Sequence, residues 1–245
     1  MRGASTGAAS SGPGESFRWK GKYSYDLQSR ETLETRLGVF ADFRPKLPES
    51  FRSSSYLFLG NIDPELQLGV LEQIARPKLV VCDTMNYWIK LKKDALMALL
   101  ARVDLLMVND SEARELSGDW NIHRAGRWIL ANGPKRVVVK QGEHGAMLIE
   151  PGRTFYAPAF PLEEVFDPTG AGDAFAGGFM GYLARTDSVT EEGMRSAMVY
   201  GAAMGSYAVS HFGIRGFEGV TLIDVQRRVR TFRDLTHVAL AELVK

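Results

Sequence analysis

The order of apolar and polar residues near the start of the chain has a period of two. Between residues 17 and 40, aromatic side chains alternate with polar ones, first at Phe17, Trp19, Tyr23 and Tyr25. After a polar turn over residues 26–30, the alternation resumes and runs to Val39. This pattern predicts two paired strands, a ribbon with one aromatic face. Because such a pair is at best marginally stable alone, three uses of that face stay open: sheet packing, a lid over a ligand, or a contact in a homodimer.

From residue 55 onward the rhythm changes to that of alternating strands and helices. Apolar runs of strand length occur at residues 56–59, 79–82, 105–108 and 137–139. Helical patterns occur at residues 65–75, 92–101, 111–116 and 122–131. Fully apolar strands separated by helices are typical of a mostly parallel sheet covered on both faces. The pattern therefore predicts an α/β fold.

The second half of the chain adds a turn and further helices. Glycines at residues 142 and 145, between apolar residues 137–140 and 146–149, predict a hairpin or tight loop. Helices are predicted at residues 191–211 and 222–241. Polar residues follow several strands, namely Asn61, Asp63, Asp83, Asn86, Asn109, Glu112 and Lys140. Since ligands of open α/β sheets lie beyond the carboxyl ends of the strands, these residues favour one shared site.

Composition narrows the class of protein. With 245 residues and 45% hydrophobic residues, the chain is long enough to bury a full core. The net charge of +1 and the lack of a long basic or apolar run argue against nucleic-acid and membrane partners. A single cysteine, Cys82, excludes an internal disulfide and fits a cytoplasmic location. The first residues, rich in Gly, Ser and Ala, are expected to be disordered.

The stretch over residues 167–183 carries the strongest chemical signal. Glycine and alanine surround one acid, Asp173, and a helical apolar pattern follows. Small residues let backbone N–H groups approach a ligand, and a helix start attracts anions such as phosphate. A carboxylate beside such an anion hole suits an enzyme that takes a proton from an attacking hydroxyl. The simpler alternative is an acid stabilised by the helix dipole.

Two further segments have both a structural and a functional interpretation. Asn109 and Glu112 are spaced as a helix cap, or as a polar pair that holds a hydrated Mg²⁺ ion near phosphates. Lys140 is either a solvated charge at a strand end or a group that faces phosphate oxygens. No lysine with Ser or Thr follows the glycines, which excludes a P-loop, and their spacing does not fit a dinucleotide-binding fingerprint.

These segments together resemble a known family. Residues 167–173, DPTGAGD, resemble the second signature of the ribokinase-like sugar kinases of the PfkB family, D-T-x-G-A-G-D, with Pro168 in the place of threonine. Asn109 and Glu112 match that family's Asn-x-x-Glu motif, and residues 137–145, VVVKQGEHG, are similar to its nucleotide-bordering strand and loop. The order and spacing of the three segments also agree.

The resemblance implies a fold and an activity. The implied fold is ribokinase-like α/β, a mostly parallel sheet flanked by helices with a small β-ribbon lid. The implied activity is phosphoryl transfer from ATP, with Mg²⁺, to an alcohol group of a small sugar or nucleoside. Asp173 resembles the catalytic base, and the backbone of Gly170, Ala171 and Gly172 resembles the anion hole. By the same resemblance, Asn109 and Glu112 organise Mg²⁺ through water, Lys140, Gly142 and Gly145 border the nucleotide, and residues 203–210 line the adenine.

The resemblance also sets expectations for the organisation of the chain. We expect a disordered tail over residues 1–16, a partial β lid over 17–42 and a ribokinase-like domain over 43–245. The family's first strand and sugar-gripping segment are not matched, so the alternative to a kinase is a catalytically silent nucleotide-binding or assembly module. An oxidoreductase of the GxGxxG type is disfavoured because the glycine spacing fails.

Overall fold

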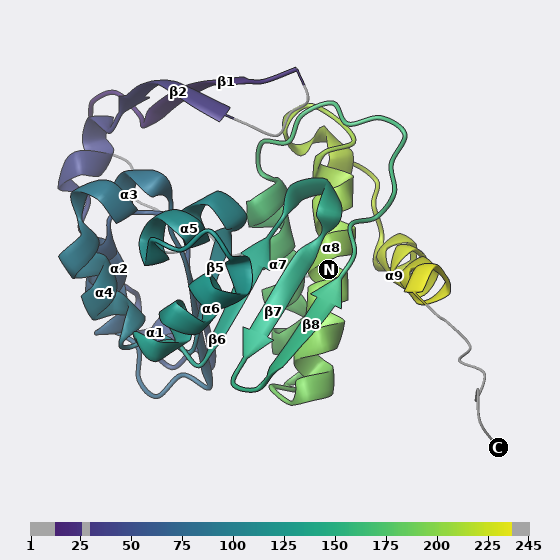
Figure 1. Ribbon diagram of the computed structural model, residues 1–245. Helices are drawn as coiled ribbons and strands as arrows, with labels where there is room; N and C mark the ends of the chain where they lie inside the picture. The colour runs from purple at the N-terminus through teal and green to yellow at the C-terminus, as the bar shows by residue number, and fades with distance from the viewer. Residues whose placement is uncertain (1–12, 26–29, 237–245) are drawn as a thin grey trace. The chain divides into compact units, whose positions relative to one another are not determined.

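The computed structural model describes residues 13–25 and 30–236 (Figure 1). Most of the tail that was expected to be disordered, the turn at residues 26–29 and the last five residues of the helix predicted to end at residue 241 lie outside the described residues. The chain divides into two compact units. Among the described residues, the first unit comprises residues 13–25, 30–106 and 131–134, and the second comprises residues 107–130 and 135–236.

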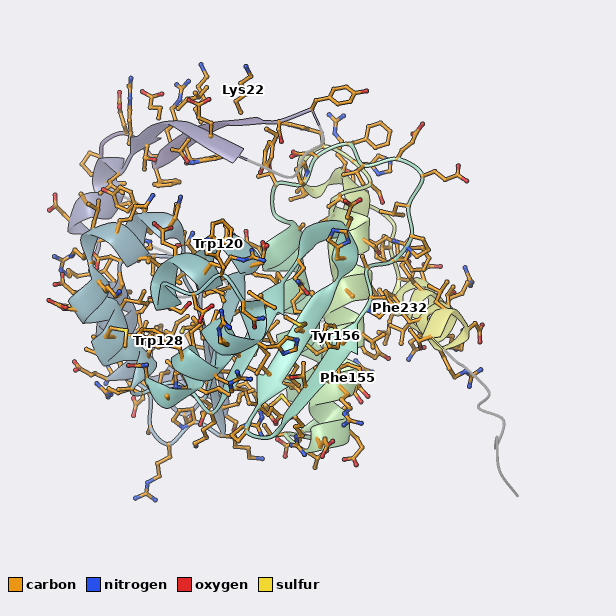
Figure 2. The ribbon with its side chains drawn as sticks, viewed as in Figure 1. Lys22, Trp120, Trp128, Phe155, Tyr156 and Phe232 are labelled. Carbon is orange, nitrogen blue, oxygen red and sulfur yellow. The ribbon has the colours of Figure 1, made fainter. Side chains whose placement is uncertain are left out.

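The predicted ribbon is present in the first unit. Strands β1 (Arg18–Tyr23) and β2 (Arg30–Arg36) pair antiparallel, with an irregularity between Lys20 and Gly21. Their side chains alternate as expected from the period of two, so Lys22 is exposed while its neighbours Gly21 and Tyr23 are half-buried (Figure 2). The ring of Phe17 packs at 5.8 Å from that of Phe40, which follows the ribbon in a 3₁₀ turn, η1 (Gly38–Asp42).

The main sheet contains both parallel and antiparallel strands. The alternation of apolar strands and helices predicted the parallel ones. Its six strands are β3 (Tyr56–Leu59), β4 (Leu79–Asp83), β5 (Leu105–Asn109), β6 (Arg136–Lys140), β7 (Ala146–Glu150) and β8 (Arg153–Ala157), in that spatial order. Strands β3 and β4 pair parallel, whereas β6, β7 and β8 form an antiparallel meander. The prediction of a mostly parallel sheet is confirmed, and the hairpin around residues 142–145 joins β6 to β7.

Strand β8 was not predicted, and its side chains show why. Along β8 only Ala157 is buried, so the strand lacks the apolar run that marks its neighbours. Its successive residues point to opposite faces: Arg195 of α8 (Glu191–Ala208) lies over the Phe155 ring, and Tyr156 bonds His123 of α6 (Ile122–Ala131) at 2.8 Å (Figure 2). In the second unit, helices therefore cover both faces of the sheet.

The first unit contains four helices among its described residues. These are α1 (Glu49–Arg52), α2 (Pro64–Leu71), α3 (Asn86–Leu91) and α4 (Lys93–Leu100). Helix α2 was expected to reach residue 75 but ends at Leu71. Helix α3 was not predicted, because a six-residue helix is too short to show a helical period. Helices α2 and α4 pack against each other.

The second unit is built on two long helices. Helix α7 (Ala171–Thr186) packs along α8, and α8 packs on β7 and β8. Glycines allow this close approach: a Cβ on Gly178 would stand 2.6 Å from the carbonyl oxygen of Tyr200. The described helices of this unit also include α5 (Asp110–Ser117), α6 and α9 (Leu222–Thr236), with 3₁₀ turns η2 (Gly142–His144) and η3 (Gly213–Phe217). Helix α8 ends at Ala208, three residues earlier than predicted.

A buried carboxylate joins the antiparallel strands of the second unit. Glu150 on β7 is 8% exposed and accepts hydrogen bonds from Arg136 on β6 and Arg153 on β8, both at 2.8 Å. Burial by itself would raise the pKa of Glu150, but the two guanidinium hydrogen bonds outweigh it and hold that pKa below its ordinary value. Arg153 also bonds Glu191 at the start of α8. The cluster therefore joins three strands and one helix.

Within the described part of the chain, no helix is long and apolar enough to cross a bilayer.

Candidate functional site

The glycine-rich loop leads into the start of α7, as the sequence predicted. Gly170 occupies the position before the helix with a left-handed backbone (φ 81°), and no side chain caps the helix there. The chain turns into it through two hydrogen bonds, from Thr169 N to Asp167 Oδ1 at 2.9 Å and from Ala171 N to Pro168 O at 3.2 Å. Asp173 lies in the first helical turn and is exposed. The carboxylate and the helix start therefore face solvent together.

Lys140 lies against the same helical turn. It is the last residue of β6, and its side chain passes so close to Gly172 that a Cβ there would stand 3.0 Å from Nζ and 3.8 Å from Cδ and Cε. Gly172 directly precedes Asp173 in the chain. The structure thus brings together two segments, the strand end and the glycine loop, that are about thirty residues apart in the sequence.

The loop after Lys140 is a tight turn whose backbone requires glycine at two positions. Gln141 N donates to Gly145 O at 2.8 Å, which closes the turn. Gly142 (φ 56°) and Gly145 (φ 93°) both have left-handed backbones, which favour glycine. A Cβ on Gly145 would also collide with the carbonyl oxygen of Ala157 on β8. Both glycines are therefore needed for the loop itself, whatever ligand it borders.

Asn109 and Glu112 form the helix cap that was one of their two interpretations. Asn109 Oδ1 accepts from Glu112 N at 2.8 Å, and Glu112 Oε2 accepts from Asn109 N at 2.9 Å, so α5 begins with a complete capping box. Glu112 is only 6% exposed. The cap does not exclude the second interpretation, because it leaves the charge of the Glu112 carboxylate in place. The single amide oxygen of Asn109 accepts from Ser111 Oγ at 2.7 Å as well as from Glu112 N.

The same pair fits a magnesium ion by its donor chemistry. Mg²⁺ prefers oxygen ligands, keeps several waters and takes only one or two carboxylates beside phosphate oxygens. Glu112 supplies one carboxylate, and Asn109, whose amide oxygen already accepts two hydrogen bonds, would contribute through water. Among the described residues, no group of three or more His, Cys, Asp or Glu side chains could hold a metal ion.

The polar residues that follow β3 and β4 belong to the first unit. Asn61 Oδ1 accepts from the indole N–H of Trp88 at 3.1 Å, and Asp63 caps α2 while it pairs with Lys92 at 2.7 Å. Asp83 is 5% exposed and accepts from Thr84 N at 2.7 Å. Asn61 and Asp63 thus have structural roles in addition to any contact with a ligand.

Gln67 was not predicted and holds these two strand ends together. It is 1% exposed, and its amide nitrogen lies 2.8 Å from Gly60 O, 2.9 Å from Asp83 O and 3.1 Å from Leu59 O. The sequence could have indicated Gln67 as a polar residue on the buried side of α2, but the pattern does not predict which groups it contacts. The side chain fixes the backbone where β3 and β4 end.

An arginine of another helix stacks on the stretch proposed to line adenine, residues 203–210. Arg228 of α9 lies 3.5 Å from the ring centroid of Tyr207 and 4.8 Å from that of Phe160, and it donates to Ser206 Oγ at 2.8 Å. Burial lowers the pKa of this guanidinium. A cavity of about 440 Å³ is lined by Phe160, Tyr207 and Arg228 together with Glu218, Gly219, Val220, Asp224, Arg227 and Thr231. Arg228 therefore forms one wall of this cavity.

Solved structures share this fold. The nucleoside kinase of Methanocaldococcus jannaschii, described as an archaeal member of the ribokinase family, superposes with a TM-score of 0.67 over 89% of this chain and 69% of that one, at 19% identity. Aminoimidazole riboside kinase of Salmonella enterica, solved with aminoimidazole riboside and an ATP analog, gives a TM-score of 0.59 over 76% and 64%, at 25% identity. The fold is the ribokinase-like α/β fold.

Sequence comparison agrees with the structural comparison. The profile of the pfkB family carbohydrate kinases matches residues 62–218, more than half of the 245 residues. The chain therefore belongs to the pfkB family of carbohydrate kinases. It is 34% identical to the cytidine kinase of Thermococcus kodakarensis over 57% of this chain and 51% of the relative, and 30% identical to the aminoimidazole riboside kinase of Salmonella typhimurium over 62% and 47%. The chain spans about half the length of these curated relatives.

Proposed function

We propose that this protein transfers a phosphoryl group from ATP to an alcohol group of a small sugar or nucleoside. The observation that carries the proposal is the exposed carboxylate of Asp173 in the first turn of α7, next to an uncapped, glycine-rich helix start. Family membership and the names of the relatives, which are sugar and nucleoside kinases, support it. The need for ATP favours the cytoplasm as the location.

In this mechanism, Asp173 accepts the proton of the attacking hydroxyl. The backbone N–H groups of Gly170 and Gly172 face the phosphate oxygens, and that of Ala171 would join them by sharing its proton with Pro168 O, which accepts it at 3.2 Å. The positive end of the α7 dipole favours the charge of these oxygens. Phosphoryl transfer needs positioning and charge stabilisation rather than a covalent intermediate. The helix start supplies the charge stabilisation, and Asp173 takes the proton.

The remaining site residues hold the nucleotide and its metal. Gly142 and Gly145 form the loop that borders the nucleotide, and Lys140 stands at the base of this loop. Asn109 and Glu112 would hold Mg²⁺ through water, and the ion, when bound, would neutralise phosphate charge. Glu112 is held in place by its capping hydrogen bond to Asn109.

The role of Asp173 is tested by Asp173→Asn, which keeps the shape of the side chain and removes its basicity. We expect MgATP-dependent phosphorylation of a panel that includes cytidine, aminoimidazole riboside and fructose to fall by about 10²–10⁴-fold. Asp187→Asn is a matched control, because Asp187 ends the same helix and its left-handed backbone tolerates asparagine. Undiminished turnover in Asp173→Asn would remove this residue from its assigned role.

Nucleotide binding can be measured apart from catalysis. MgATP should raise the melting temperature of the protein, since a ligand that binds the folded state stabilises it. An acceptor should raise it further. A response to MgATP without a response to any acceptor, and without turnover, would favour the silent nucleotide-binding module.

We also propose that the ribbon β1–β2 mediates self-association. Phe17, Leu33 and Val39 are 49%, 50% and 45% exposed, which is unusual for large apolar side chains that lie so close in the chain. Sedimentation velocity should show a dimer whose dissociation constant rises in Leu33→Lys. A monomer across the micromolar range would contradict the proposal.

A further inference from the structure

The lysine at the end of β6 has an unusual position for a surface charge. Val137, Val138 and Val139, which precede it, are fully buried, and Lys140 pairs with Ala146 of β7, so its backbone is fixed. From this base its side chain reaches the first turn of α7, where Nζ would stand 3.0 Å from a Cβ on Gly172. The ammonium group of Lys140 therefore lies beside Gly172, the residue that directly precedes Asp173.

The charges at this position favour an anion between the Lys140 ammonium and the start of α7. The start of an α-helix carries partial positive charge, so a lysine ammonium is unfavourable there by itself. Asp173 in the same turn offsets this repulsion in part. A phosphoryl group would satisfy both the helix start and the ammonium, because its oxygens accept charge-assisted hydrogen bonds from each.

We propose that Lys140 is a further catalytic residue, whose ammonium binds the phosphoryl group that is transferred rather than the rest of the nucleotide. This inference rests on the proposed function. The base must lie beside the attacking hydroxyl and therefore near the reacting phosphorus. Lys140 lies beside Gly172, the residue next to that base. A cation at this place contacts the γ-phosphate, whereas one further from Asp173 would contact the α- or β-phosphate.

The step balances without another reactant. The acceptor oxygen forms a bond to the γ-phosphorus, and the bond from that phosphorus to the bridging oxygen breaks, so ADP leaves with the electron pair. The hydroxyl proton goes to the Asp173 carboxylate. Lys140 keeps its proton and donates hydrogen bonds to a non-bridging γ-oxygen, whose charge it stabilises through the transition state.

Gly172 has a role in this arrangement. Its φ lies outside the left-handed range, so a side chain is not excluded by backbone strain. What a Cβ would meet is the end of the Lys140 side chain. Gly172→Ala should therefore fold normally and displace the ammonium, which lowers turnover. Gly177→Ala, in the same helix with nothing within 4 Å of its Cβ, should leave turnover unchanged.

The decisive experiment compares two nucleotides by isothermal titration calorimetry. Dissociation constants for MgADP and for the magnesium complex of β,γ-imido-ATP are measured in the full chain, in Lys140→Met and in Lys135→Met. Lys135 is exposed and precedes β6 at its other end, which makes it a matched control. We expect Lys140→Met to weaken the ATP analog about tenfold, as one charge-assisted hydrogen bond would, while ADP binding changes little. Lys135→Met should change neither.

The outcomes separate this inference from the proposed function. Equal weakening of both nucleotides would assign Lys140 to the α- or β-phosphate and overturn the inference, and so would no weakening of either. In another outcome, wild-type protein binds the analog more tightly than Lys140→Met does but phosphorylates no acceptor. This result would contradict the proposed kinase activity and would still support the γ-phosphate contact. Where turnover is measured, Lys140→Met should lower kcat by about 10²–10³-fold. Wild-type protein that binds neither nucleotide would overturn both.

Discussion

Asn109 and Glu112 cap the same helix start reciprocally: each side chain accepts a hydrogen bond from the backbone N–H of the other, at 2.8 and 2.9 Å. The pair is proposed both to begin α5 and to organise Mg²⁺. A substitution that lowers activity is therefore ambiguous unless stability is measured as well. Two variants distinguish the roles, because a glutamine can keep the cap without the charge.

We predict that Glu112→Gln separates capping from metal binding. Glutamine serves in a capping box as glutamate does, so the free energy of unfolding without ligand should stay within about 0.5 kcal/mol of wild type. Asn109→Ala should cost about 1 kcal/mol, since it removes the cap. In contrast, the increase of melting temperature with MgATP should shrink in Glu112→Gln. Thermal unfolding with and without MgATP checks both statements, and an unchanged response to MgATP would count against the metal role.

Gln67 provides a prediction for the first unit. Gln67→Met keeps the volume of the side chain but removes the donor to the carbonyl oxygens of Leu59, Gly60 and Asp83. Because buried carbonyl groups are left without that partner, we expect a loss of about 1–3 kcal/mol in urea unfolding. Glu72→Gln, an exposed change after the end of α2, should stay within about 0.5 kcal/mol. Equal stability of the two variants would contradict the role of Gln67.

Two adjacent glycines of α7 should respond to alanine with opposite sign. A Cβ on Gly178 would stand 2.6 Å from Tyr200 O and 2.7 Å from Met204 Cγ of α8, so Gly178→Ala forces the helices apart and should cost about 1–3 kcal/mol. Gly177 has open space, and alanine there should stabilise by about 0.5–1 kcal/mol through helix propensity. Chemical unfolding of both variants tests the close packing of α7 on α8. Destabilisation by both changes would show that the space beside Gly177 is filled.

Glu150 makes stability depend on pH. Its pKa is held below the ordinary value in the folded protein, so its contribution is present above the unfolded pKa of about 4.5 and is lost as the pH falls through the lower folded pKa. Glu150→Gln should therefore be less stable than wild type at pH 7, by about 1.5–3 kcal/mol for a charged hydrogen-bond partner. The difference should shrink as the pH is lowered from 5 toward 3. Unfolding at several pH values measures it, and a constant difference would exclude the linkage.

Strands and long helices were predictable because their signal is local. The runs that became β3, β4, β5 and β6 are apolar throughout, and α6 begins and ends where its pattern does. Strand β8 escaped prediction because only one of its residues is buried and it lacks the apolar run of its neighbours, and α3 because it is too short to show a period. The ends of α2 and α8 were misplaced because their boundaries depend on caps and tertiary contacts rather than on periodicity.

The sequence alone determined the class of fold, the glycine-rich helix start and the acid within it, since each depends on residue types at fixed spacing in one short segment. The spacing of Asn109 and Glu112 also indicated the cap of α5, which the structure contains. Only the tertiary structure decided that Gln67 joins the ends of β3 and β4 and that Lys140 lies against Gly172. The physical reason is the same for both. Each of these contacts joins residues of two separate elements. The distance between such residues is set by how strands pair and helices pack, so the hydrophobic period within either element does not predict it.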